Sequence, residues 1–430
     1  MPVPAPPSIR QPRAVQAVRF ARSQKGFFEK AAHLGDVFQA NFQRRRWNVL
    51  THPDAVKEVF TASPEVLHAG KGNEILATAL GEHSVLILDE GEHMRQRKLL
   101  LPSFHGERLA AQAETIRRIA EREVERMPRD GSFSMRDHSQ AIALEVILEI
   151  VLGTESTGTE HDDLARRSTA ILEWIGRPFS LLLPGLFGPR HPLVRRVYRP
   201  ALDPLDESLY RLIAGRRQEP DLEQREDMLS MLLTARDEQG NPMSDVEVRD
   251  EIVTLIVAGH ETTATALAWA FERLAHTEGS TEALQRAVAD GDDEYVTAVS
   301  QETLRLRPVL DVVVRQVNEP IEIAGYAFER GEMVVPCIHL IHRREDIYPD
   351  PLEFRPSRWK DEKPGTYTWI PFGGGVRRCI GASFAMAEME IVMKAVAAAG
   401  VLEPVGGDEE AVQRFITSSP ARGGELRFAI

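Results

Sequence analysis

The sequence predicts a mainly α-helical protein with a small β portion, folded as a single domain. Apolar residues recur at helical spacing over most of the 430 residues. One helical pattern, from Ser244 to about His276, covers 33 residues and would span roughly 50 Å. Short β patterns occur at residues 37–50 and 312–335, with a further strand pattern at residues 425–430. Pairing between the first two would join distant parts of the chain in one domain.

The composition is that of an acidic globular protein, with 43% hydrophobic residues and a formal net charge of −13. A basic nucleic-acid-binding protein is therefore not expected. Two cysteines cannot form a disulfide framework, and we expect Cys337 to be a small buried apolar residue. The sequence has no signal peptide and no apolar run of the ~18–20 residues that span a bilayer. We expect a cytoplasmic monomer without a membrane anchor.

The helical elements follow in order along the chain, after a Pro-rich segment (residues 1–12) that we expect to be disordered. Residues 13–430 then form the domain. Residues 109–127 and 141–152 have helical patterns, and the second is more apolar. Ser244 and Glu247 form an S-x-x-E capping box, which marks the start of the long helix. The middle of this helix, residues 252–259, is apolar all round, so we expect it to be buried on every side.

The most informative segment is residues 371–381, which read P-F-G-G-G-V-R-R-C-I-G. Three consecutive glycines permit positive φ angles and close approach of the backbone to a flat ligand. A strong helix pattern begins after Gly381, so Cys379 lies just before a helix N-terminus, which favours its thiolate by roughly 0.3–1 kcal/mol. A phosphate-binding loop would need Lys-Ser/Thr after the glycines, and none is present. A Gly-rich turn before a surface helix remains the simpler alternative.

The same segment resembles the cysteine-ligand signature of the cytochromes P-450, F-x-x-G-x-R-x-C-x-G. All five specified positions match: Phe372, Gly375, Arg377, Cys379 and Gly381. The resemblance implies a triangular, mainly α-helical single domain with a long central helix over haem b (iron protoporphyrin IX). It implies that the Cys379 thiolate is the axial iron ligand, which favours O–O cleavage. It further implies that Phe372 packs beside the ring near the sulfur, and that Arg377 binds a haem propionate.

A second motif, A-G-H-E-T-T at residues 258–263, lies within the long helix. Gly and Thr are poor residues for a helix interior, and a tolerated kink in a buried helix would also explain them. The resemblance implies that Gly259 leaves room beside the iron. It implies that Thr262 offers its hydroxyl to bound dioxygen while Glu261 helps to relay protons.

A third motif is E-T-L-R, in which Glu302 and Arg305 share a helix face and can pair. Such pairs are common on exposed helices and are weak evidence alone. Here the pair is followed by F-R-P-S-R-W at residues 354–359. The resemblance implies that Glu302 and Arg305 form a structural network with Arg358, bracing the fold around the haem pocket.

Three further residues are candidates to bind the haem propionates. His93 and Arg97 are i and i+4 on one helix face, an arrangement that also arises by accident on surface helices. The resemblance implies that both bind propionates. Arg315, in the β segment that follows the Glu302 helix, resembles another propionate ligand by its position.

The resemblance implies an oxygen-activating monooxygenase that uses two electrons and two protons, usually to hydroxylate an unactivated C–H bond. No flavin or nicotinamide fingerprint accompanies the haem motif. We therefore expect a separate ferredoxin or flavodoxin, with a reductase that draws on NAD(P)H. Basic residues are expected on the thiolate side and would steer an acidic partner, unless they are scattered solvated charges. These residues are Arg95, Lys98, Arg343, Arg344 and Arg378.

The segments expected near the substrate are mostly apolar, which favours a lipophilic substrate such as a fatty acid, steroid or terpenoid. The candidate pocket residues are Leu86, Phe179, Leu255, Ala258, Val312, Val313 and Thr417. Three alternatives share the haem thiolate: a peroxide-using peroxygenase, a non-catalytic haem-binding sensor, and an oxygen-independent dehydratase or isomerase. The Glu261–Thr262 pair argues against the first and the third. A sensor would not consume reductant with oxygen and substrate.

Overall fold

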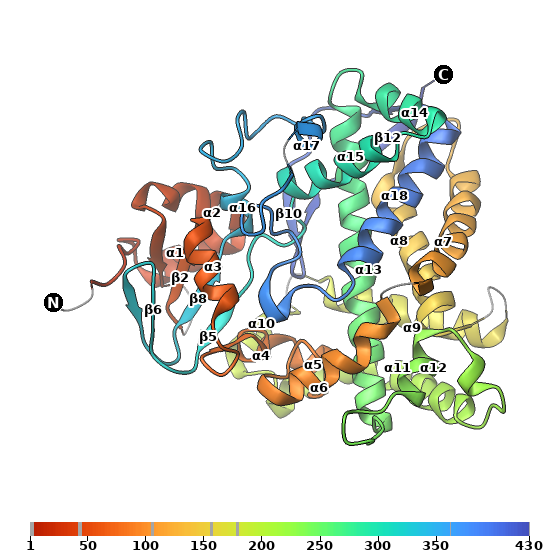
Figure 1. Cartoon of the computed structure of the whole chain (residues 1–430), viewed down its shortest axis with the longest axis horizontal. Helices are drawn as coiled ribbons and strands as arrows, with labels where there is room; N and C mark the ends of the chain where they lie inside the picture. Colours follow the sequence, from red (N-terminus) through yellow and green to blue (C-terminus); the bar gives the residue numbers. More distant parts are fainter. Residues whose placement is uncertain are drawn as a thin grey trace.

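A single helix of 31 residues, α13 (Asp245–Ala275), crosses the molecule from one edge to the other (Figure 1). The computed structural model describes residues 4–41, 45–104, 107–154, 158–177, 180–361 and 363–429. The Ser244 hydroxyl accepts the N–H of Glu247, and the Glu247 carboxylate accepts the N–H of Ser244 at 2.7 Å. This reciprocal capping fixes the start of α13. The helix ends with His276 as its C-cap, so both predicted ends are confirmed.

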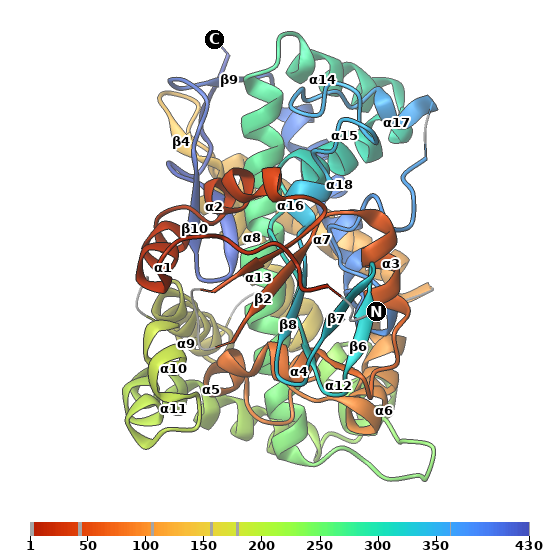
Figure 2. The ribbon, with the colours of Figure 1, turned by 90° about the vertical axis from the view of Figure 1, so that its left-hand side faces the viewer.

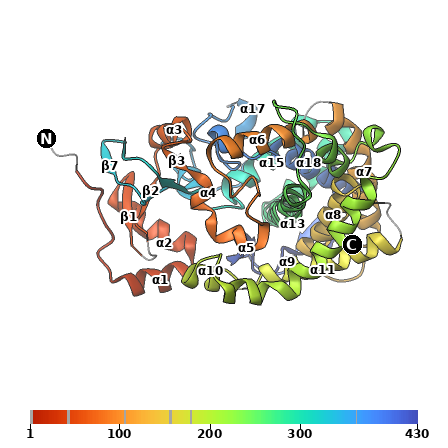
Figure 3. The same ribbon diagram turned by 90° about the horizontal axis from the view of Figure 1, so that it is seen from below.

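Most of the remaining helices pack around α13, and Figure 3 shows α13 end-on among them. Its neighbours include α8 and α18, while α7 packs on α18 and α9 packs on α11. The larger helices are α7 (Glu107–Arg126), α8 (Met135–Val146), α9 (Thr159–Ile175), α11 (Pro192–Arg216), α14 (Ser280–Asp290), α15 (Asp293–Leu306) and α18 (Ala382–Ala399). The two predicted helices at 109–127 and 141–152 are confirmed as α7 and α8, the latter continued by a π-helical turn over Ile147–Val151.

The β portion joins the two distant segments that the sequence predicted to pair. Strand β2 (Trp47–Leu50) lies parallel to β8 (Met333–Pro336), with Trp47 opposite Met333. The strands of this sheet follow the order β1-β2-β8-β5-β3, in which β1 is Val37–Ala40, β5 is Arg315–Val317 and β3 is Leu67–His68. Figure 2 shows β2 and β8 side by side in front of α13. One sheet therefore connects the N-terminal and C-terminal parts of the domain.

Shorter elements complete the fold. The remaining strands are β4 (Phe133–Ser134), β6 (Ile321–Ile323), β7 (Tyr326–Phe328), β9 (Leu402–Pro404), β10 (Ala411–Arg414), β11 (Thr417–Pro420) and β12 (Glu425–Phe428). The remaining helices are α1 (Arg13–Arg22), α2 (Gln24–Ala31), α3 (Pro53–Thr61), α4 (Ala69–Gly72), α5 (Ala77–Leu80), α6 (Glu90–Leu100), α10 (Leu182–Phe187), α12 (Met228–Thr234), α16 (Ile338–Ile341) and α17 (Arg358–Asp361).

Part of the N-terminal segment that we expect to be disordered lies against the β-sheet. Pro7 and Ile9 exchange backbone hydrogen bonds with Gln39 at 2.8 and 3.0 Å, so this part of the segment lies along β1. The Pro-rich sequence has no strand pattern of its own. Its backbone hydrogen bonds to the edge strand β1 hold it in place. Among the helices of the described residues, none is both long and apolar enough to cross a lipid bilayer.

Candidate active site

The cysteine loop is held by its own backbone and by α3. The N–H of Cys379 donates to the carbonyl of Phe372 at 2.9 Å, which closes the loop. Gly373 and Gly375 have φ angles of +66° and +64°, a region that favours glycine. A Cβ atom on Gly375 would lie 2.1 Å from the carbonyl oxygen of Phe60 at the end of α3. The glycines are therefore required by the turn and by close packing.

The Cys379 thiol combines exposed surface with desolvation by the surrounding protein. It has exposed surface, whereas Cys337 is fully buried in the core, as predicted. Yet protein surrounds Cys379 closely enough for burial to raise the pKa of its thiol, against the opposing effects of the Gly381 N–H and the charges of Arg378 and Arg97. The Gly381 N–H and the charges of Arg378 and Arg97 favour the thiolate, which is the form of cysteine that binds a metal.

The middle of α13 has one open face, which corrects the expectation that residues 252–259 are buried on every side. Ala258 is exposed, and Leu255, Gly259 and Thr262 are half-buried, whereas most of their neighbours on the helix are buried. Positions 255, 258, 259 and 262 lie on one helix face. An apolar sequence cannot indicate which face of a helix is left uncovered, because that depends on the elements that pack around it.

Thr262 and Glu261 make different contacts, although they are adjacent in sequence. The Thr262 hydroxyl donates to the Ala258 carbonyl at 2.6 Å, on the open face of α13. The Glu261 carboxylate receives two hydrogen bonds from Arg136 of α8, both at 2.8 Å, and one from Gln140 at 2.9 Å. The hydroxyl is therefore on the open face, while the carboxylate is held by α8.

A buried cationic cluster brings together all four predicted propionate ligands. His93 is 1% exposed, and its Nδ1 atom has no hydrogen-bond partner among the residues that the structure describes. Burial lowers the pKa of His93 to about 3, with further lowering by the charges of Arg377, Arg97 and Arg315. Burial likewise lowers the pKa values of Arg315 and Arg377 to about 10 each. Positive charge is concentrated here where little solvent can screen it.

One carboxylate, that of Asp89, lies within this cluster. Arg377 donates to Asp89 at 2.6 Å and to the carbonyls of Val85 and Leu88. The other two guanidinium groups have no such partner: Arg97 forms no ion pair with any residue that the structure describes, and Arg315 donates to the carbonyl of its neighbour in sequence. Buried charges require compensation. An excess of buried cations, an unpartnered imidazole nitrogen and a nearby thiol fit haem with its two propionates.

The Glu302 network is built on a fully buried ion pair. Glu302 and Arg305 are both 0% exposed and are joined by two hydrogen bonds of 2.8 Å. Arg358 donates to the same carboxylate at 3.0 Å, and the Trp359 indole donates at 3.1 Å. Arg305 also donates to the carbonyl of His342 at 2.9 Å. The structure thus brings the three predicted residues together and connects α15 to α17.

The predicted substrate residues do not all share one environment. Four of them are half-buried: Leu86, Leu255, Val312 and Val313. Ala258 is exposed on the open face of α13. Thr417 is buried, and its hydroxyl donates to the carbonyl of Arg414 at 2.8 Å. Phe179 lies outside the described residues.

The predicted basic patch is largely neutralised. Arg95, Lys98 and Arg344 each pair with a carboxylate, at 2.7, 2.6 and 2.8 Å. Arg343 is desolvated, and burial lowers its pKa to about 10. Only Arg378 among the five is exposed and unpaired within the part of the chain that the structure describes. The patch was wrong as a group, because carboxylates from distant segments cannot be located from sequence.

Sequence reasoning missed one buried acid between α13 and α18. Glu388 of α18 is 2% exposed, and its Oε1 atom has no hydrogen-bond partner within the described part of the chain. Burial raises the pKa of Glu388 to about 8, against a hydrogen bond with Thr263 of α13. Glu388 therefore lies between the helix that follows Cys379 and the helix that carries Thr262. Its position among apolar residues such as Met389 and Val392 was the available signal.

Comparison with known proteins decides the family. The family model of cytochrome P450 matches residues 4–397. The chain is a cytochrome P450. Cytochrome P450 135A1 of Mycobacterium tuberculosis is 37% identical over 98% of this chain and 94% of its own length. Cytochrome P450 135B1 of Mycobacterium bovis is 39% identical over 98% and 91%.

The fold of this P450 is also that of a solved relative. The retinoic acid-bound cyanobacterial CYP120A1 superposes with a TM-score of 0.85 and covers 99% of both chains, at 23% identity. The mainly α-helical single domain predicted from the sequence is thus confirmed. As a member of this family, the chain is a haem-thiolate oxidoreductase of the monooxygenase type that uses haem and dioxygen.

Proposed function

We propose that this P450 hydroxylates a lipophilic small molecule with electrons delivered by a separate ferredoxin or flavodoxin. The observation that carries the proposal is the open face in the middle of α13. A hydroxyl group, Thr262, lies on that face among the small or apolar residues Leu255, Ala258 and Gly259. An apolar space with one hydroxyl beside it suits dioxygen and a C–H bond. Neither dioxygen nor an apolar C–H bond is bound well by a charged site.

The residues that would hold haem b are Cys379 as the iron ligand and His93, Arg97, Arg315 and Arg377 around the propionates. Two propionates would compensate the excess charge of the cluster, and His93 would gain the partner that its Nδ1 atom lacks. When bound, haem supplies the iron at which dioxygen is reduced and from which oxygen is inserted into the substrate.

Residues of this chain would control the delivery of protons. The Thr262 hydroxyl can turn from the Ala258 carbonyl to a ligand on the open face, because a hydroxyl both donates and accepts. Glu261 is adjacent in sequence, but Arg136 and Gln140 hold its carboxylate. We infer that Arg136 must release this carboxylate before Glu261 can pass protons toward Thr262. The exchange of partners would make Arg136 a positioning residue for proton delivery.

The first test is the absorption spectrum of the reduced, carbon monoxide-bound protein. Haem-loaded wild type is expected to have the strongly red-shifted Soret band of thiolate ligation, whereas Cys379→Ala loses it. The matched control is Cys337→Ala, which removes the other thiol and keeps the band because Cys337 lies in the core. A red-shifted band that persists in Cys379→Ala would overturn the assignment of the ligand.

The second measurement separates a monooxygenase from the alternatives. With a lipophile selected by its spin-state change, a ferredoxin and its reductase, the protein should consume oxygen and NADH and form hydroxylated product. A sensor would bind the lipophile without consuming NADH. A peroxygenase would form product only with added peroxide.

A further inference from the structure

The carboxylate of Glu247 bonds to two helices at once. Its Oε2 atom accepts the N–H of Ser244 at 2.7 Å and the Ser244 hydroxyl at 2.8 Å, which caps α13. Its Oε1 atom accepts a guanidinium N–H of Arg95 at 2.6 Å and the side-chain amide of Gln96 at 2.9 Å. Arg95 and Gln96 belong to α6. A single side chain therefore joins the first turn of α13 to α6.

Arg95 makes a second connection, to the loop that precedes α13. Its Nε atom donates to the Asp237 carboxylate at 2.7 Å, and its guanidinium also donates to the carbonyl of Pro242 at 3.3 Å. Asp237 accepts the N–H groups of Gln239 and Asn241 at 3.0 and 2.8 Å, so its side chain organises the loop. Arg95 thus binds both the loop and the helix that follows it.

These connections are partly shielded from solvent. The side chains of Arg95, Glu247 and Asp237 are 29, 17 and 6% exposed. By contrast, Lys98 and Glu238 form an ion pair between the same two segments with side chains that are 55 and 69% exposed. A pair exposed to that extent contributes little, whereas charge-assisted hydrogen bonds at shielded positions hold their partners more strictly.

The residues that make these connections are interleaved with two of the residues assigned to the haem propionates. His93 and Arg97 are four residues apart and share one face of α6. Arg95 lies between them in sequence and therefore on the opposite side of the helix. The start of α13 thus holds α6 from the side opposite to His93 and Arg97.

We propose that Arg95 and Glu247 are positioning residues for haem, because they fix α6 against α13 with His93 and Arg97 in place for the propionates. This role rests on the proposed binding of the propionates by His93 and Arg97. It places the charge of Arg95 inside the protein, in contrast to the contact with an electron-transfer partner that the sequence predicted.

The test is the rate at which the ferric, haem-loaded protein loses haem to an excess of apomyoglobin. Arg95→Gln and Glu247→Gln are each expected to lose haem about tenfold faster than wild type, since residues that orient ligand side chains commonly affect binding by this factor or more. Glu247→Gln keeps a residue that can complete the capping box, so it weakens the connection to α6 and preserves the start of α13. The double variant should resemble Arg95→Gln, because both changes remove a shared interaction.

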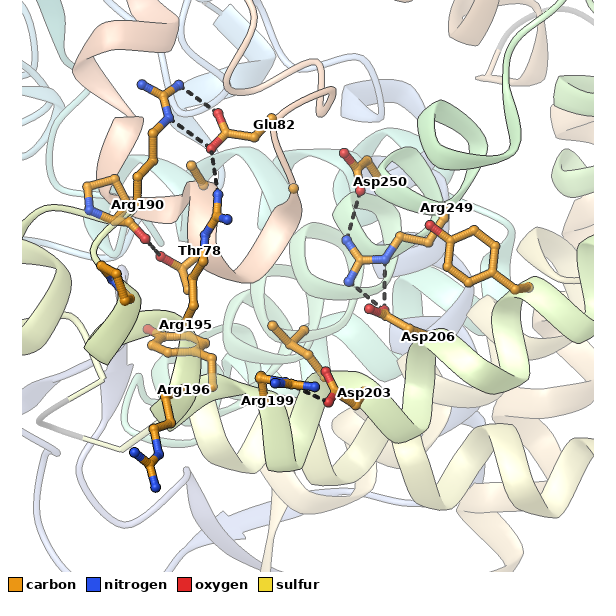
Figure 4. A pocket seen from close by; sticks show the side chains of 17 residues that line it. Thr78, Glu82, Arg190, Arg195, Arg196, Arg199, Asp203, Asp206, Arg249 and Asp250 are labelled. Carbon is orange, nitrogen blue, oxygen red and sulfur yellow. Dashed lines mark hydrogen bonds and ion pairs between the residues drawn. The ribbon is translucent and has the colours of Figure 1, made fainter.

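Two control variants destabilise the same end of α13 without removing a bond to α6. Ser244→Ala removes the capping hydroxyl. Arg249→Gln removes an arginine that, like Arg95, binds two carboxylates: it donates to Asp206 and to Asp250, each at 2.8 Å. These three residues line a cavity of about 720 Å³ between α5 and α11 (Figure 4). Both controls should unfold at lower urea concentration than wild type but lose haem at the wild-type rate.

Gln96→Leu is a milder variant, for use if Arg95→Gln does not assemble with haem. It removes one hydrogen bond to Glu247 and no charge, so haem loss should be faster than in wild type and slower than in Glu247→Gln. Equal acceleration in Ser244→Ala, Arg249→Gln and the α6 variants would overturn the positioning role, because general destabilisation would then account for it.

Arg97→Gln separates this role from the assignment of the propionate ligands, since it is the same substitution on the other side of α6. Faster haem loss in Arg97→Gln, with wild-type loss in Arg95→Gln and Gln96→Leu, would exclude the positioning role alone. Wild-type loss in Arg97→Gln would contradict the propionate assignment and the positioning role with it. Reduction of Arg95→Gln by ferredoxin should keep the wild-type salt dependence, whereas a changed salt dependence with normal haem retention would assign Arg95 to partner binding.

Discussion

His342 illustrates how one buried side chain makes this fold sensitive to acid. Its Nε2 atom accepts the N–H of Ile370 at 2.9 Å, so this nitrogen must be unprotonated. Its Nδ1 atom lies 3.2 Å from the carbonyl of Arg305, which positions a donor there. Burial, with the charges of Arg305 and Arg343, lowers the pKa of His342 to about 3. The neutral ring thus joins the Glu302 network to the segment before the cysteine loop.

The lowered pKa predicts a loss of stability as the pH falls. In the unfolded chain a histidine takes up a proton near pH 6.5, whereas folded His342 stays neutral down to about pH 3. Its contribution is therefore complete above pH 6.5 and declines as the pH falls toward 3, by up to ~1.4 kcal/mol per pH unit. Between pH 6.5 and 5 this amounts to about 2 kcal/mol.

Urea unfolding at pH 7 and pH 5 checks this prediction. His342→Gln should be less stable than wild type at pH 7, because a hydrogen bond is strained or lost, and should lose about 2 kcal/mol less between the two pH values. The control is His33→Gln, which changes an exposed histidine and should keep the wild-type pH dependence. The same pH dependence in His342→Gln would count against the buried neutral ring.

At the scale of elements, α13 combines a rigid position with an open face. The capping box at Ser244 fixes its start, and buried neighbours hold it on most sides. A Cβ atom on Gly259 would meet only Ile147, at 3.6 Å, so the glycine is not required for helix packing. Because glycine has no side chain, α13 leaves room beside Thr262. The element therefore presents one hydroxyl on a face that is otherwise apolar.

We expect Thr262→Ala to fold and still to consume NADH and oxygen, but to release hydrogen peroxide instead of product. The hydroxyl to which we assign control of proton delivery is lost, and general acid–base groups typically contribute 10²–10⁴-fold. The product formed per NADH should fall by about tenfold or more. The measurement is the ratio of hydroxylated product to NADH consumed. Thr262→Ser, which keeps the hydroxyl, should restore the ratio, and an unchanged ratio in Thr262→Ala would exclude this role.

At the scale of the whole molecule, the distribution of charge decides where an acidic electron-transfer partner could bind. The chain is acidic overall, and three of the five arginines and lysines expected near the thiolate side are paired with carboxylates. Arg378, adjacent to Cys379, is exposed and unpaired within the described ranges. It is therefore the group best placed to attract a ferredoxin toward the thiolate.

Arg378→Glu should slow reduction of the haem by an acidic ferredoxin by about threefold or more at low ionic strength, because steering depends on the sign of the local potential. The difference should disappear at high salt, where exposed charges are screened. Stopped-flow reduction across a salt series measures it. The control is Arg286→Glu on α14, which makes the same charge change elsewhere. Equal rates for both variants at every salt concentration would contradict the assignment.

The sequence alone determined the elements and the chemistry that depend on neighbours along the chain. The start of α13 followed from its capping residues and its length from an uninterrupted helical pattern, the strand segments from their short β patterns, and the candidate ligand Cys379 from its spacing to Phe372, Gly375 and Arg377. Local hydrogen bonds and backbone preferences act over a few residues, so they can be inferred from the sequence.

Only the tertiary structure decided which side chains meet across the chain. It left the face of α13 around Ala258 open, paired Glu261 with Arg136, neutralised most of the expected basic patch and buried Glu388 between two helices. It also formed the arginine-rich cavity between α5 and α11. Burial, charge pairing and open space depend on partners that lie tens or hundreds of residues apart, and one sequence carries no direct record of those distances.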